Sequence, residues 1–169
     1  MTFYSFNHQI RFNNKHEFNS SFGRNRSSYN SNIKKILIKF CDTLNNKNIE
    51  FLSLDFLEVK LDSLKNTDLV YCDPPYLTST ATYNDGKGGF KDWGIGEESK
   101  LLNLLDKLNS NKINFALSNM FYHKGLKNIE LIKWSKKYNI NYIDNDYSNC
   151  NYQFKEKDKF SIAVLITNF

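Results

Sequence analysis

Proline is almost absent from this chain: there are two in 169 residues, and they are adjacent, at Pro74 and Pro75. Cysteine is scarce as well. The three cysteines lie far apart, with no C-x-x-C pair and no cysteine–histidine cluster at metal-ligand spacing. The pattern therefore indicates neither a metal site nor a disulfide framework. Reduced thiols fit a cytoplasmic protein best, and this is the location that we expect.

Long apolar runs are missing too. No stretch approaches the roughly 20 apolar residues that a membrane-spanning helix needs, and residues 1–12 lack the basic-then-apolar layout of a signal peptide, so we expect no membrane association. Hydrophobic residues nevertheless make up 40% of the chain, which is too apolar for disorder and predicts one folded domain. The net charge of +5 permits contact with nucleic acid, but proteins of many functions share it.

Hydrophobic periodicity predicts helices and strands in alternation. Helices are expected over residues 31–46, 94–111 and 128–139, and strands at 49–54, 68–72, 112–119, 140–147 and 160–169. Either Ser31 or Asn32 is expected to cap the first helix. The alternation indicates an α/β domain with a parallel sheet. Residues 68–72 form a short, continuously apolar strand, of the type that is buried on both faces of such a sheet.

Asp73 follows this strand directly, and ligands of open α/β sheets bind beyond the carboxyl ends of strands. Pro74 and Pro75 restrict φ and have no amide hydrogen, so the chain leaves the strand along a rigid, extended path. This path points the Asp73 carboxylate and the Pro74 carbonyl outward as two hydrogen-bond acceptors. Tyr76 adds a flat aromatic face.

Two acceptors beside an aromatic ring suit one substrate group especially well, the exocyclic amine of a planar base. Its lone pair is delocalised into the ring, and accepting both amine hydrogens frees that lone pair for attack. A base inside a duplex must first be flipped out, at a cost of a few kcal/mol. The alternative is a strand that ends in an ordinary proline turn with an accidental Asp73 and Tyr76.

The segment "DPPY" after an apolar strand resembles the catalytic motif of DNA amino-methyltransferases. An aspartate at its first position is similar to the adenine-N6 enzymes rather than to the cytosine-N4 enzymes. The segment "RFNNKHEFNSSFGR", residues 11–24, looks like the N-x-x-G-x-F-N-x-P-x-G segment of DNA adenine methylases. The likeness extends to residues 51–56, 112–119, 141–152 and 163–169, so that it covers nearly the whole chain and is specific. The resemblance implies part of a Rossmann-like, S-adenosylmethionine-dependent α/β methyltransferase sheet with flanking helices.

By this resemblance, Asp73, Pro74 and Tyr76 bind the flipped adenine, and Pro75 shapes the turn. Asp55 and Phe56 fall where the family contacts the adenine part of S-adenosylmethionine, and Asp73 also borders that cofactor. The alternatives are ordinary structural roles: Asp55 as a carboxylate that caps the next turn, and Phe56 as a core residue.

The resemblance assigns residues 1–30 to the family's DNA-contacting hairpin and residues 31–169 to the C-terminal part of the catalytic domain. The implied contacts to double-stranded DNA come from Arg11, Phe12, Asn13, Lys15, Arg24 and Arg26. The basic side chains would neutralise phosphates, and the phenylalanine would wedge between bases. His16 stands where the family usually has glycine, and Ser21 where it usually has proline. The alternative is an ordinary solvated basic loop.

Glycine is missing where the family needs it. Family members carry, ahead of these segments, a glycine-bearing strand-to-helix turn that lets backbone approach the cofactor, and later an acidic residue for the ribose. Neither is found; the segments "DGKGGF" and "GIGEE" come after the motif and follow no strand. Three alternatives stay open: part of a split enzyme whose companion chain supplies the cofactor-binding half, a truncated or decayed enzyme, or a rearranged smaller sheet. Without those family strands, residues 68–72 are expected to expose an apolar edge.

The sequence thus predicts an adenine-specific DNA methyltransferase in truncated or split form. The alternative is a non-catalytic DNA-binding or interaction module derived from one. An RNA or protein-glutamine methyltransferase fits less well, because position 73 is aspartate and the N-terminal likeness is to DNA enzymes. Ser118 and Asn119 either line the pocket or, as we favour, simply close their strand. Trp93 either anchors the core or belongs to a loop that closes over the base.

Overall fold

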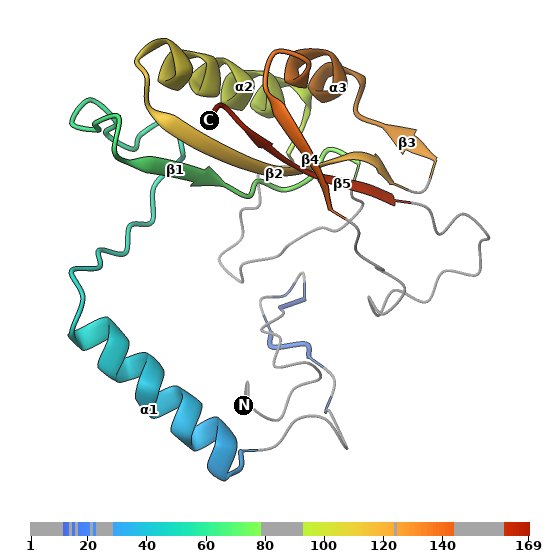
Figure 1. Cartoon of the computed structure of the whole chain (residues 1–169). Coiled ribbons are helices and arrows are strands. Elements are labelled where there is room, and N and C mark those ends of the chain that lie inside the picture. The colour runs from blue at the N-terminus through green and yellow to red at the C-terminus, as the bar shows by residue number, and fades with distance from the viewer. Residues whose placement is uncertain are drawn as a thin grey trace. The chain divides into compact units, whose positions relative to one another are not determined.

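The computed structural model describes residues 12–13, 15, 17–20, 22, 29–78, 93–123, 125–143 and 161–169. The described residues divide into two compact units, the first holding those up to Val59 and the second those from Lys60 onward. Along the chain the elements are α1 (Ser31–Asn45), β1 (Leu69–Cys72), α2 (Ile95–Ser110), β2 (Asn114–His123), β3 (Leu126–Lys127), α3 (Ile129–Ser135), β4 (Asn139–Ile143) and β5 (Ser161–Thr167) (Figure 1). None of the helices within these ranges combines the length and apolar character that crossing a bilayer requires.

Helix α1 belongs to the first unit, and it buries none of its residues. Its cap is neither Ser31 nor Asn32, as the sequence had suggested, but Asn30, whose Oδ1 accepts a hydrogen bond from the Ile33 backbone N–H at 3.0 Å. The cap lies one residue earlier because Ser31 already has helical backbone geometry, and an N-cap residue does not.

The prediction of a strand at residues 49–54 is wrong. In the structure these residues are exposed and have no strand conformation. A strand satisfies its backbone groups by pairing with a neighbour, and among the described strands none pairs with this segment. Its apolar residues indicated a strand, but the pattern carried no information on whether a partner strand is present.

The second unit is built on a five-stranded sheet in the order β1-β2-β5-β4, with the short β3 paired to the end of β2. Strands β1 and β2 are parallel, and α2 supplies the crossover that a parallel pair needs. The other pairs, β2–β5 and β4–β5, are antiparallel. Among the described strands, the expectation of a parallel sheet therefore holds for one pair only, because an alternation of helices and strands reports element types and not strand direction.

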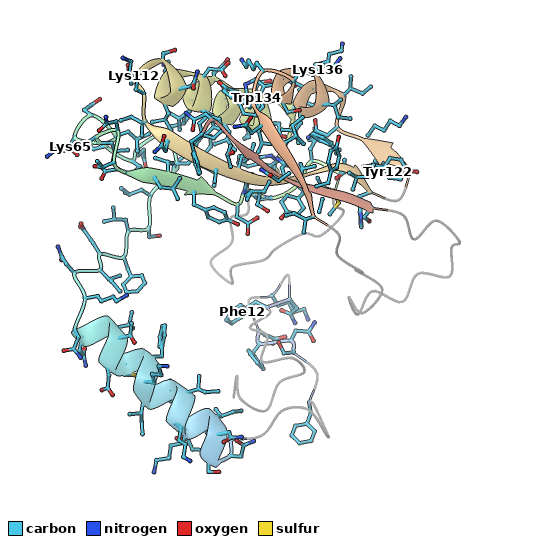
Figure 2. All side chains as sticks on the ribbon, viewed as in Figure 1. Phe12, Lys65, Lys112, Tyr122, Trp134 and Lys136 are labelled. Carbon is cyan, nitrogen blue, oxygen red and sulfur yellow. The ribbon has the colours of Figure 1, made fainter. Side chains whose placement is uncertain are left out.

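Both helices of the second unit cover the same face of the sheet (Figure 1). Side chains fill the layer between α2, α3 and the strands, with Trp134 of α3 within it (Figure 2). The buried apolar side chains of this core include Leu101, Leu102, Leu105, Leu108, Phe115, Leu117, Leu131, Val164 and Ile166. The α2 members recur at helical spacing, which is why the sequence predicted this helix correctly.

Strand β1 lies at one end of the strand order, and β2 is its only partner among the described strands. Val70 and Cys72 pair with buried Phe115 and Leu117, whereas Leu69 and Tyr71, on the opposite face, are 56% and 59% exposed. Burial on both faces was therefore the wrong expectation for β1. Among the described strands β1 lies at the edge of the sheet, as expected, and the apolar surface that it exposes is the face with Leu69 and Tyr71.

Candidate active site

The "DPPY" motif lies at the carboxyl end of β1, as predicted, because Asp73 follows the last strand residue, Cys72. Asp73 is exposed, while Pro74, Pro75 and Tyr76 are half-buried. The Tyr76 hydroxyl donates a hydrogen bond to Asp73 Oδ1 at 3.0 Å. The motif thus folds back on itself: the ring and the carboxylate lie together, and one carboxylate oxygen already has a donor.

Ser118 of β2 completes this cluster. In the parallel register Cys72 pairs with Leu117, so the residues that follow them, Asp73 and Ser118, reach the same level of the sheet. Ser118 Oγ lies 3.2 Å from the Tyr76 hydroxyl. Our preference for a purely strand-closing role of Ser118 therefore missed a contact with the motif. The parallel pairing of the two strands was the signal that could have found it.

Asn119 points to the other face of β2, since successive strand residues alternate. There its amide donates to Glu98 Oε1 at 3.2 Å. Glu98, in the first turns of α2, is fully buried, at 0% exposure, and also accepts from Asn128 Nδ2 at 2.8 Å and from Trp93 Nε1 at 2.8 Å. This buried network ties α2 to β2 and to the start of α3. Sequence reasoning missed it, because a glutamate on an amphipathic helix usually faces solvent.

Of the two roles considered for Trp93, the structure supports that of a core anchor, because its indole N–H donates a hydrogen bond to buried Glu98. The "GIGEE" segment is a helix start: Gly94 is the N-cap of α2, and its N–H donates to Glu97 Oε2 at 3.2 Å. Thr78, two residues after the motif, is buried, and its hydroxyl has no hydrogen-bond partner among the described residues. Burial raises the pKa of the Cys72 thiol, which keeps this group protonated beneath the motif.

Asp55 and Phe56 belong to the first unit, and Asp73 to the second. Asp55 shapes a local turn: its Oδ1 accepts from the Leu57 N–H at 3.0 Å, and its carbonyl accepts from the Glu58 N–H at 2.9 Å. These hydrogen bonds match the alternative role considered for Asp55, that of a carboxylate that caps the next turn. Contact of Asp55 and Phe56 with a cofactor stays a prediction.

Three of the predicted DNA contacts, Arg11, Arg24 and Arg26, lie outside the described residues. Phe12 forms an antiparallel bridge with Phe18, and their rings meet edge to face with centroids 6.2 Å apart. Asn13 Oδ1 accepts from the backbone N–H groups of Lys15 and Glu17 at 2.9 and 3.0 Å. These contacts are those of a tight hairpin, in which the Asn13 side chain stabilises the turn. Binding of DNA by Phe12, Asn13 and Lys15 stays a prediction.

A model of the D12 class N6 adenine-specific DNA methyltransferases matches residues 1–158. The chain is 49% identical over 166 residues to the type II methyltransferase M.FokI of Planomicrobium okeanokoites, and 45% identical over 168 residues to the modification methylase StsI of Streptococcus sanguinis; each alignment covers 98% of this chain and 25% of the relative. It is 29% identical over 119 residues to the DNA adenine methylase of Salmonella typhi, covering 69% of this chain and 40% of that protein.

The chain therefore belongs to the D12 class N6 adenine-specific DNA methyltransferase family. It spans about a quarter of the length of the type II relatives that it matches.

Proposed function

We propose that this chain supplies the adenine-binding part of a DNA methyltransferase that methylates the N6 amine of a flipped adenine. The observation that carries the proposal is the cluster at the end of β1, where the Tyr76 hydroxyl donates to Asp73 Oδ1 at 3.0 Å beside the two prolines. The carboxylate of Asp73 and the ring of Tyr76 lie together there, and in this proposal the carbonyl of Pro74, between them in the chain, faces the same amine. These are the groups that a planar base with an exocyclic amine requires.

In this proposal the Asp73 carboxylate and the Pro74 carbonyl each accept one hydrogen of N6. The nitrogen becomes more tetrahedral, and its lone pair is released from the adenine ring. S-adenosylmethionine, when bound, would supply the electrophilic methyl group for this lone pair, with its thioether as the leaving group. Asp73 takes up the proton that N6 loses and passes it to water. The Tyr76 ring lies against the base and holds it in place.

The residues of this chain fit the base better than they fit the methyl donor. Asp55 and Phe56 would contact its adenine part, and Asp55 is exposed, although one of its carboxylate oxygens already accepts from Leu57. Among the described residues, no glycine lies at a turn from a strand into a helix; Gly94 and Gly96 lie at the start of α2, and Gly125 lies between β2 and β3.

We therefore propose that the donor-binding half lies outside these residues, elsewhere in the polypeptide or on a companion chain. The edge of β1 and its exposed face with Leu69 and Tyr71 are the surfaces that such a half would cover. A parallel pair such as β1 and β2 is usually found inside a sheet that is covered on both faces, and this supports the proposal.

For DNA, we propose that residues 1–30 contact the duplex and that residues 31–169 form part of the catalytic domain. Arg11, Lys15, Arg24 and Arg26 would neutralise phosphates. The support is the net charge of +5 and the family match, which includes this segment.

The test is transfer of a labelled methyl group from S-adenosylmethionine to adenine in double-stranded DNA, with the product of the neighbouring reading frame added. Asp73→Ala should lower kcat by about 100-fold or more, because it removes the acceptor of the N6 proton. Asp62→Ala, which changes an exposed carboxylate of the same unit, is the matched control and should have no effect.

Titration with S-adenosylmethionine separates the two halves of the proposal. If the chain alone bound S-adenosylmethionine with micromolar affinity, the proposal that the methyl-donor site lies outside these residues would be contradicted. DNA binding without methyl transfer in any combination would indicate instead the non-catalytic DNA-binding module.

A further inference from the structure

We propose that Ser118 is a positioning residue for the adenine-binding motif: its hydroxyl orients the Tyr76 hydroxyl, which in turn holds one oxygen of Asp73. Its consequence for catalysis rests on the function proposed above. The hydrogen-bond chain itself rests on geometry alone and can be tested without any methyl transfer.

The direction of the chain follows from the number of hydrogens. An ionised carboxylate only accepts, so the single hydrogen of the Tyr76 phenol lies on the 3.0 Å bond to Asp73 Oδ1. The 3.2 Å contact between Tyr76 and Ser118 must then use the serine hydrogen, with the phenol oxygen as acceptor. Ser118 therefore donates to Tyr76, and Tyr76 donates to Asp73.

Two bonds in series polarise one another, so the serine strengthens the bond between Tyr76 and Asp73. They also restrict the tyrosine ring and the carboxylate at the same time. With Oδ1 held by Tyr76, Oδ2 is the oxygen that Asp73 presents to a substrate amine. Placement matters here, because a displacement of about 1 Å in a reacting group can cost about 100-fold in rate.

The alternative is that Ser118 merely fills its place in β2. Its hydroxyl, however, makes its contact with the motif, 42 residues away along the chain, while the next side chain, Asn119, turns to the opposite face and bonds buried Glu98. The hydrogen bond from Asn119 to Glu98 already fixes β2 to α2 at this level. The Ser118 hydroxyl is therefore not needed to hold the strand, and it can orient Tyr76.

The first experiment observes the hydrogen bond in the full chain by NMR, with tyrosine labelled with ¹³C at Cζ. The Tyr76 signal is assigned by its loss in Tyr76→Phe. Ser118→Ala should shift this signal, and Ser118→Thr should restore it, because threonine keeps the hydroxyl. Thr78→Val is the matched control: it removes a hydroxyl two residues from Tyr76 that has no hydrogen-bond partner in the described part of the chain, and the Tyr76 signal should stay in place. An unchanged signal in Ser118→Ala would overturn the proposal.

The second experiment measures methyl transfer under the conditions used for Asp73→Ala. Ser118→Ala should lower kcat by about 10- to 100-fold with little change in the KM for DNA, because it misplaces groups without removing them. In a Tyr76→Phe background the same substitution should cost nothing more. Ser118→Cys, which is similar in size and a weak donor, serves if the alanine variant does not fold.

Equal losses from Ser118→Ala with and without the Tyr76 hydroxyl would show a merely structural role and overturn the proposal. If the unmodified protein transfers no methyl group, the proposed function fails, and the NMR result still decides whether Ser118 orients Tyr76.

Discussion

Helices α1 and α2 carry the same kind of apolar pattern, but only α2 buries it. In α1 no residue is buried, and Ile36 and Phe40 are 68% and 56% exposed. In α2 four leucines pack against the sheet. The comparison shows that an amphipathic period predicts a helix and the face that it would bury, and not whether a partner surface is present. An isolated helix of this length is marginal in water, so α1 depends more on its cap and on local propensity.

The largest effect is expected from truncating the buried leucine side chain at the centre of α2. Leu105→Ala should lower the free energy of unfolding by about 2–5 kcal/mol, because it leaves a cavity among Leu101, Leu108 and the strands. Ile36→Ala on α1 should change it by less than about 0.5 kcal/mol. Unfolding in urea, followed by circular dichroism, measures both. A loss in Ile36→Ala as large as that in Leu105→Ala would show that α1 is packed after all.

A smaller effect is expected at the caps of α1 and α3, which are both asparagines. Asn30 accepts from the Ile33 N–H, and Asn128 accepts from the Leu131 N–H, but Asn128 also donates to buried Glu98. Asn30→Ala should therefore cost about 1 kcal/mol. Asn128→Ala should cost about 2–3 kcal/mol, because it removes a cap and leaves a buried carboxylate short of a donor.

Thermal unfolding of the two cap variants, with Asn128→Ser as a variant that keeps the cap, separates these contributions. Equal losses at both caps would show that the bond between Asn128 and Glu98 contributes little.

The smallest effect concerns the charge of Asp106 on α2, which faces α3 and the residues that follow it. Asp106 of α2 accepts from Lys137 Nζ and the Tyr138 hydroxyl, both at 2.7 Å, and from Trp134 Nε1 at 2.8 Å. Burial raises the pKa of Asp106, but the three hydrogen bonds and the Lys137 charge outweigh it and hold this pKa below its ordinary value. Burial, together with the Asp106 carboxylate, raises the pKa of Tyr138.

Because the pKa of Asp106 is lower in the folded state, its contribution to stability is present above the unfolded value of about 4 and is lost as the pH falls below it. Asp106→Asn should reduce stability at pH 7 by less than about 1 kcal/mol, since the carboxylate is partly exposed, and should flatten the decline below pH 4. Urea unfolding between pH 2 and 7 measures this. Asp42→Asn on α1 is the control, and a decline that flattens as much in this variant would contradict the assignment.

Much of the second unit was predictable, because its elements are encoded locally. The apolar run at residues 68–72 and the adjacent prolines placed a strand and its end, and the structure has the strand at Leu69–Cys72, directly before the motif. The period of α2 and the apolar runs of β2 and β5 were equally informative. The failures have one physical cause. The strand expected at residues 49–54, the strand directions and the burial of Tyr71 all depend on which segments become neighbours, and a local pattern does not record this.

The candidate site divides in the same way. The sequence by itself determined that Asp73 and Tyr76 follow the end of β1 on either side of two prolines, whose rings restrict the path of the chain. Only the tertiary structure decided that Tyr76 meets Ser118 and that Asn119 turns away to buried Glu98. The reason is register: a shift of one residue between β1 and β2 would exchange the faces of Ser118 and Asn119, and that alignment is set by the packing of the whole sheet against α2 and α3.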